Sequence, residues 1–105
     1  MDKLARLKIL LGEPLPSDEV LNEYLNISEA EILNWLYIRV GDAPEGASLP
    51  ARYDQIQIMA VVAAVNIIGA EGETTHIENG MHRVFKYEDL IAYIHSHVQP
   101  YVVLS

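Results

Sequence analysis

Hydrophobic residues recur every three or four positions early in the chain, the spacing that places side chains on one face of an α-helix. Residues 3–11 carry such a stripe, and Gly12 follows it as a common residue at a helix C-terminus. A second stripe predicts a helix over residues 18–40, with Ser17 as its N-cap and acidic residues in its first turn. The first stripe consists of Leu4, Leu7, Leu10 and Leu11.

Ser28 and Glu31 form a capping-box pattern inside this second segment. The pattern leaves two arrangements open: one long helix, or a break near Asn26 and a new helix from Ser28. We favour one continuous or slightly kinked helix, because the apolar stripe from Val20 to Val40 runs through both parts.

A third helix is predicted over residues 50–68, where Pro50 suits the first helical position. Hydrophobic residues cover nearly every face of this segment. A helix that is apolar all round must be covered by other elements or by other subunits. In a chain of 105 residues, this pattern indicates an oligomer.

The next segment, residues 71–85, has the pattern of a β-hairpin. Asn79-Gly80 is a strong turn signal, and residues 74–77 and 81–85 flank it with strand-compatible side chains. A last helix is predicted over 86–98, and Pro100 ends it. The tail, residues 100–105, is apolar and too short to fold on itself, so we expect it and the hairpin arm (residues 71–85) to contact neighbouring molecules.

Together these elements predict a single domain, residues 1–105, of the mostly all-α class. We expect a small bundle of about four helices with a long hairpin-like loop between the last two. The predicted core comprises Leu21, Leu25, Leu33, Leu36, Ile56, Ala60, Ala63, Leu90 and Ile94.

Composition and charge narrow the possible functions. The chain has no cysteine and a formal net charge of −8, and residues 13–31 contain acidic but no basic side chains. Gripping DNA requires clustered Lys and Arg, so the chain is a poor candidate for a DNA-binding protein. The longest apolar stretch, residues 56–68, is shorter than the roughly 20 residues of a membrane span. We expect a soluble intracellular protein without a secretory signal.

The chain offers little catalytic chemistry. His95 and His97 are two residues apart on a helix and cannot share a metal as an i, i+4 pair would. His76 and His82 lie on opposite arms of the predicted hairpin. Nothing resembles an activated nucleophile or a phosphate-binding loop, so we expect no enzyme, no metal and no cofactor.

The segment from Gly69 to Phe85 resembles the small phage head-tail connector family, whose members are also described as adaptor, head-completion or DNA-packaging proteins. Members end a long apolar helix with Gly-x-Glu-Gly, here residues 69–72. A Ser/Thr-rich turn, a Gly-hydrophobic-x-Arg stretch (residues 80–83) and a short helix ending near Pro-Tyr follow, here Pro100-Tyr101. The resemblance covers nearly the whole chain.

This resemblance implies a viral structural subunit that assembles in the host cytoplasm and becomes part of the virion neck. Its partners would be the portal protein, a further neck or tail-completion protein, and its own copies in a twelve-fold ring. The ring would extend the channel through which DNA passes without specific binding. Acidic side chains suit such a wall because they repel phosphate.

Two sets of residues are therefore predicted to be functional. Glu19 and Glu23 are candidates for facing the channel. The candidate interface residues are Glu71, Thr74, Thr75, Ile77, Asn79, Gly80, Met81, Arg83, Phe85, Tyr101, Val102, Val103 and Leu104. The alternative function is a small acidic regulator, an anti-repressor or DNA mimic, that uses residues 13–31 as a decoy for a basic groove.

Overall fold

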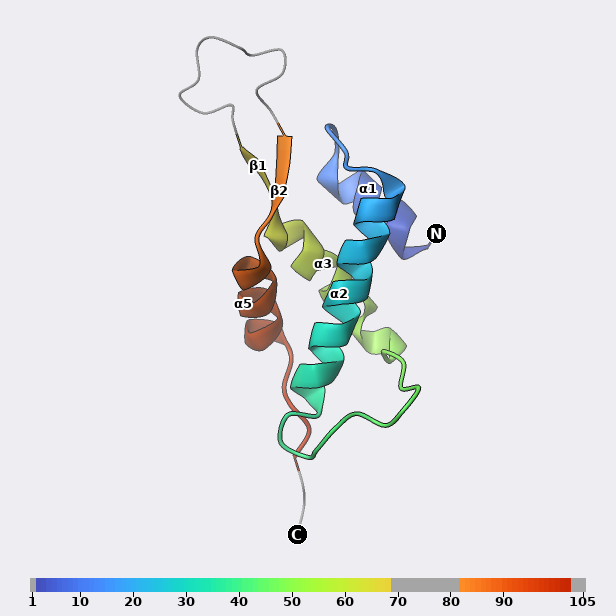
Figure 1. The fold of residues 1–105 in the computed structure, drawn as a ribbon, viewed down its shortest axis with the longest axis vertical. Coiled ribbons are helices and arrows are strands. Elements are labelled where there is room, and N and C mark those ends of the chain that lie inside the picture. The colour runs from blue at the N-terminus through green and yellow to red at the C-terminus, as the bar shows by residue number, and fades with distance from the viewer. Residues whose placement is uncertain (1, 69–81, 103–105) are drawn as a thin grey trace.

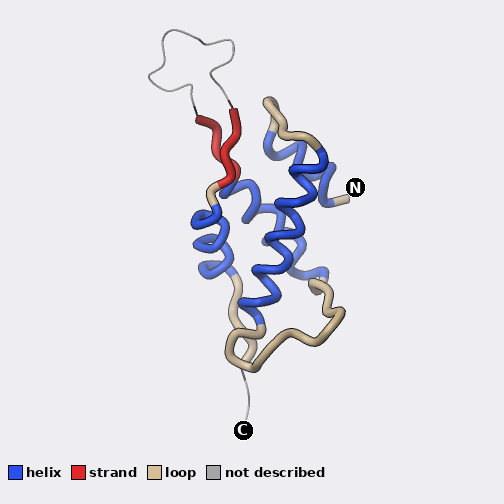
Figure 2. The backbone as a smooth tube through the Cα atoms, viewed as in Figure 1, coloured by secondary structure: helices blue, strands red, loops and turns tan. Residues whose placement is uncertain are grey.

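The computed structural model describes residues 2–68 and 82–102 (Figure 1). In these residues, four α-helices and one two-stranded sheet form a small, mostly helical bundle. The strands lie at the end of the body opposite the C-terminus, as Figure 2 shows in red. The predicted fold class is confirmed.

Helix α1, Lys3–Leu11, has the predicted bounds because both of its ends are capped locally. The Asp2 carboxylate accepts a hydrogen bond from the Ala5 N–H at 2.8 Å. At the other end, Gly12 has a φ of 69° and donates its N–H to the Lys8 carbonyl oxygen. A positive φ of this kind favours glycine over residues with a side chain.

Helix α2, Asp18–Leu36, is one continuous helix that begins where the sequence predicts. Ser28 does not cap a second helix, because its side chain is buried and donates to the Leu25 carbonyl oxygen at 2.8 Å. The predicted end at residue 40 is wrong. The chain tightens into turns after Leu36, and the Leu36 carbonyl oxygen accepts from the distant Tyr101 N–H at 2.8 Å instead of continuing the helix.

The predicted helix over 50–68 is also wrong in extent. The segment divides into a 3₁₀ turn η1, Ala51–Tyr53, helix α3, Asp54–Ala64, and strand β1, Val65–Ile68. Val65 has extended backbone angles, φ −94° and ψ 95°. Three of the four residues of β1, Val65, Ile67 and Ile68, are apolar and β-branched, so the segment suits a strand as well as a helix.

Strand β1 pairs antiparallel with β2, His82–Phe85, in a register that places Val65 opposite Phe85 and Ile68 opposite His82. The strand predicted over 81–85 therefore pairs with residues that the sequence placed in the helix over 50–68. Residues 74–77 and the Asn79-Gly80 turn lie outside the described residues.

Helix α5, Tyr87–His97, lies within the predicted range 86–98 and closes one side of the bundle. Helix α3 occupies the middle and contacts α1, α2 and α5. Its apolar faces are therefore covered largely within one subunit, and the oligomer inferred from them does not follow from this helix.

The buried core resembles the predicted one, but α2 and α3 each bury a somewhat different face from the predicted face. Ile32 replaces Leu33 as the buried residue of α2, because the inner face of α2 runs through Leu25, Ser28, Ile32 and Leu36. On α3, Ile58 is buried while Ile56 and Ala63 are half-buried. The buried hydrophobic residues are Leu7, Leu21, Leu25, Ile32, Leu36, Ile58, Ala60, Val61, Ala64, Val65, Leu90, Ile94 and Val98.

Candidate assembly surfaces

The base of the β1–β2 ladder is fixed to the helical body by two contacts. The Lys86 N–H donates to the Ala64 carbonyl oxygen at 2.8 Å, where α3 passes into β1. The Phe85 ring stacks on Tyr24 of α2 with centroids 4.3 Å apart. Phe85, a predicted interface residue, is thus half-buried against its own subunit.

Beyond this base, the ladder is a two-stranded sheet in the part of the chain that the structure describes. Each strand of such a sheet has an outer edge whose backbone groups have no partner within the sheet. Arg83, another predicted interface residue, lies on β2 opposite Ile67 of β1. Nine further candidates lie outside the described residues: Glu71, Thr74, Thr75, Ile77, Asn79, Gly80, Met81, Val103 and Leu104.

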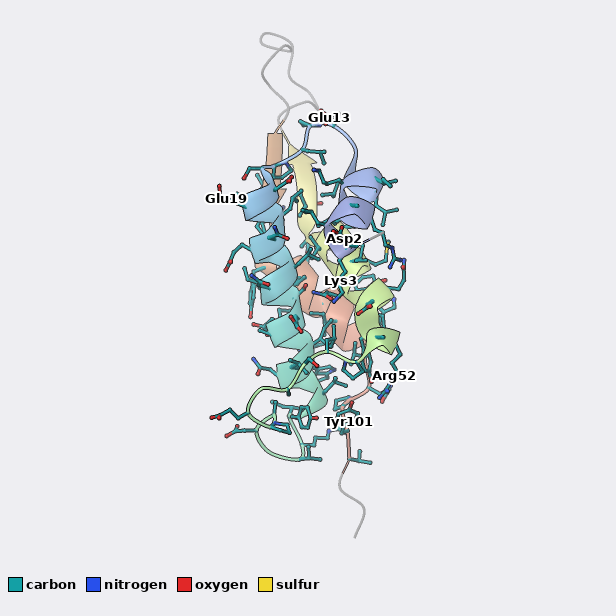
Figure 3. All side chains as sticks on the ribbon, turned by 90° about the vertical axis from the view of Figure 1, so that its right-hand side faces the viewer. Asp2, Lys3, Glu13, Glu19, Arg52 and Tyr101 are labelled. Carbon is teal, nitrogen blue, oxygen red and sulfur yellow. The ribbon has the colours of Figure 1, made fainter. Side chains whose placement is uncertain are left out.

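The start of the C-terminal tail packs on its own subunit, whereas the sequence predicts contacts of the tail with neighbouring molecules. Besides the hydrogen bond to Leu36, the Tyr101 ring meets Tyr37 edge-on with centroids 5.2 Å apart. The Tyr101 hydroxyl accepts a hydrogen bond from Arg52 at 3.4 Å. Figure 3 shows Arg52 and Tyr101 near one another. Val102, by contrast, is 58% exposed.

The tyrosine pKa values at this end and at the start of α5 are shifted upward. Burial is the largest cause of the raised pKa of Tyr101. For Tyr87, the hydrogen bond that its hydroxyl makes with the Glu31 carboxylate is the largest cause of the raised pKa. Both phenols therefore stay protonated at neutral pH and act in packing and hydrogen bonding.

The outer face of α2 is polar and acidic. Glu19 and Glu23, the predicted channel residues, are both exposed, and Glu19 points away from the body in Figure 3. They continue into a ridge of exposed residues at helical spacing, Asn26, Ala30 and Asn34. Asp18 of the same helix is engaged with Lys8 of α1 in an ion pair of 2.9 Å.

The histidines of α5 have structural roles. His95 stacks on Trp35 with ring centroids 3.8 Å apart. His97 stacks on Tyr93, and its Nδ1 lies 2.8 Å from the Tyr93 carbonyl oxygen. Across residues 2–68 and 82–102, no cluster of three His, Cys, Asp or Glu is placed to hold a metal. The described helices include none long and apolar enough to cross a membrane.

A model of the phage gp6-like head-tail connector protein family matches residues 1–100. The chain belongs to this family. The match spans every described helix and both strands. This connector is therefore a structural protein of the phage neck, a virion component that contacts other head and tail proteins, and its family is not one of enzymes.

The searches of curated proteins and of solved structures found no match to this connector. The family assignment thus stands on the whole-chain family match, and it agrees with the helical fold.

One exposed surface of the connector was not recognised in the sequence. Leu10 was grouped with the inner stripe of α1, yet it is 48% exposed, and the adjacent Ile9 is 66% exposed. The sequence did contain a sign of this exposed surface. Leu4, Leu7 and Leu11 fill the packed side of α1, so its further apolar residues must point away from the core.

Proposed function

We propose that this connector assembles on the portal as a closed, twelve-fold ring after DNA packaging. The ring extends the DNA channel and offers a docking surface to the next neck or tail-completion protein. Assembly takes place in the host cytoplasm before the finished neck becomes part of the virion.

The observation that carries the proposal is the β1–β2 ladder at one end of the helical body (Figure 2). Its outer edges can accept a further strand, because main-chain hydrogen bonds to an exposed edge are a general mode of protein recognition. A two-stranded sheet is marginally stable alone, so pairing with a neighbouring chain would stabilise it. The ladder and the hairpin arm beyond it are the proposed contact with a neighbouring subunit or the portal.

The exposed carboxylates of α2 support the channel role. Glu19 and Glu23 lie on a face that packs against no other described element. A wall of such carboxylates repels the phosphate backbone, so DNA slides past it without being bound. This is the function proposed for Glu19 and Glu23.

The end of the chain supplies the second proposed contact. Tyr101 packs on its own subunit. Among the described residues of the tail, Val102 is the one exposed to a partner. An exposed valine beside further apolar residues of the sequence, Val103 and Leu104, suits a docking segment.

The test is the mass of the connector measured by light scattering, alone and mixed with portal protein. We expect a complex of portal with many connector copies, and weaker binding when residues 102–105 are deleted. Truncation after Tyr101 keeps the Leu36 contact, so the shortened chain should stay folded by circular dichroism. A connector that remains small beside the portal, and instead competes with DNA for a basic protein, would support the regulator alternative and overturn the proposal.

A further inference from the structure

The outer face of α1 combines exposed hydrophobic side chains with positive charge. Ile9 is 66% and Leu10 48% exposed, which places two large apolar residues side by side on the surface. Ile9 lies between two shallow hollows of about 400 and 210 Å³. Exposed apolar groups of this kind on a virion protein indicate a surface that is covered after assembly.

The charge of this face comes mainly from Arg6. Lys3 and Lys8 are each neutralised inside the subunit, by Asp54 at 3.3 Å and by Asp18 at 2.9 Å. Arg6 instead donates to the neutral side chain of Gln55, and among the described residues it has no ion pair. The α1 face therefore requires a partner that is both apolar and acidic.

The chain itself carries such a surface at the start of α5. Tyr87 is 49% exposed, and Glu88 beside it is exposed and has no ion pair within the described residues. Asp89 adds a second carboxylate, which accepts a 3.3 Å hydrogen bond from the Asn66 side chain. Tyrosine and arginine are among the side chains enriched at protein interfaces, and an Arg guanidinium can stack on a Tyr ring.

The other exposed hydrophobic residues fit less well. Ile38 is followed by Arg39, whose charge has the same sign as that of Arg6. Val20 lies beside Glu19 at the start of α2. The Lys8–Asp18 ion pair already holds this part of α2 against α1 of the same subunit. Val102, at 58% exposure, belongs to the tail contact proposed above.

The two helices that carry these faces are separated in the bundle. In Figure 1, α1 is at the right and α5 at the left, with α2 and α3 between them. Contact between two different surfaces of the same chain is a head-to-tail contact, which closes into a ring when the rotation between subunits allows it. In Figure 3, seen from the α1 side, Glu19 points sideways, so the proposed channel residue stays clear of both faces.

We infer that the α1 face (Arg6, Ile9 and Leu10) of one copy docks on the α5 face (Tyr87, Glu88 and Asp89) of the next copy. This inference rests on the proposed ring and adds a helix-to-helix contact between its subunits to the proposed contact through the β1–β2 ladder. Ile9 and Leu10 cover the Tyr87 ring, while Arg6 pairs with Glu88.

Site-directed cross-linking tests the contact, because the chain has no cysteine of its own. Ile9→Cys and Glu88→Cys are made as separate chains with different tags, mixed, assembled and oxidised. We expect disulfides between the two chains, and none when Ile9→Cys is mixed with Ile38→Cys, a control at a similarly exposed site in the turn after α2. Linkage of Ile9→Cys to itself would show a two-fold contact through α1 and would overturn the inference.

A charge exchange provides the second measurement. Arg6→Glu and Glu88→Arg should each reduce the assembled fraction in light scattering, and the double variant should restore it. If wild-type rings form with the portal but neither cross-linking nor rescue is seen, the inference fails and the proposed function stands. If no assembly of any kind forms with or without portal, both are overturned.

Discussion

The indole N–H of Trp35 donates a 2.8 Å hydrogen bond to the carbonyl oxygen of Val98, 63 residues away in the chain. This contact joins the C-terminal end of α2 to the residue that follows α5. The same indole stacks on His95, so one side chain fixes both the end of α5 and its rotation against α2. The tail leaves the body from this point, and Tyr101 then returns to Leu36.

Replacing Trp35 by Phe should destabilise the subunit by about 1–3 kcal/mol, because the buried Val98 carbonyl loses its donor. Urea denaturation followed by circular dichroism measures this change. The matched control is His95→Gln, which removes only the stacking partner at an exposed position and should cost less than about 1 kcal/mol. Equal effects of the two changes would mean that stacking, and not the hydrogen bond, holds this junction.

Leu36→Ala should cost about 2–5 kcal/mol, because it leaves a cavity at a fully buried position. Leu33→Ala is the comparison within the same helix, and its half-buried side chain should cost clearly less. Thermal or urea unfolding of both variants gives the difference. Similar losses would show that the inner face of α2 is not the one through Ile32 and Leu36.

Reversing Glu19 and Glu23 to Lys should leave the subunit folded, since both side chains are exposed and no described element packs on them. Assembled on the portal, the double variant should retain DNA in a salt-sensitive way, because lysines neutralise phosphate charge. Retention is measured on portal complexes over a range of salt concentrations. Reversal of Glu45, an exposed carboxylate of the loop after α2, is the control. DNA passage like that of the unmodified protein would place Glu19 and Glu23 outside the channel.

The raised pKa of Tyr101 predicts a loss of stability at alkaline pH. In the unfolded chain a tyrosine ionises near about pH 10, whereas folded Tyr101 keeps its proton to higher pH. The unfolded state thus binds fewer protons above that pH, and the free energy of unfolding falls as pH rises. The contribution is complete below about pH 10 and disappears as pH passes the folded pKa.

Urea midpoints measured from neutral pH to above about pH 10 should therefore decline less steeply in Tyr101→Phe than in the unmodified chain. Tyr87→Phe should also flatten the decline, because the pKa of Tyr87 is raised as well. Tyr24→Phe, at a tyrosine that stacks on Phe85, serves as the comparison. An unchanged slope in Tyr101→Phe would show that Tyr101 does not stay protonated in the folded state.

The sequence was enough to select many of the candidate functional residues. It was not enough to tell which of them are exposed and which pack inside their own subunit. Glu19 and Glu23 were predicted as candidates for facing the channel, and both side chains are exposed. Phe85 and Tyr101 were assigned to an interface, whereas each ring packs on an aromatic residue of α2 or the turn after it. These partners lie far away in sequence, so no local pattern reveals them.

The sequence by itself determined the elements whose causes are local. Helix α1 and the start of α2 follow from capping side chains and helical periodicity, which act within a few residues. The connector family also followed from the sequence, since its motifs are read along the chain.

Only the tertiary structure decided where α3 stops and where α2 ends. Val65–Ile68 satisfies both a helical and a strand pattern, and pairing with His82–Phe85 selects the strand because it gives both backbones their hydrogen bonds. At the end of α2, the Leu36 carbonyl oxygen can accept from a residue in the next helical turn or from Tyr101. The packing of the tail favours Tyr101, because it brings the Tyr101 nitrogen to 2.8 Å from the Leu36 oxygen and also buries Val98 in the core.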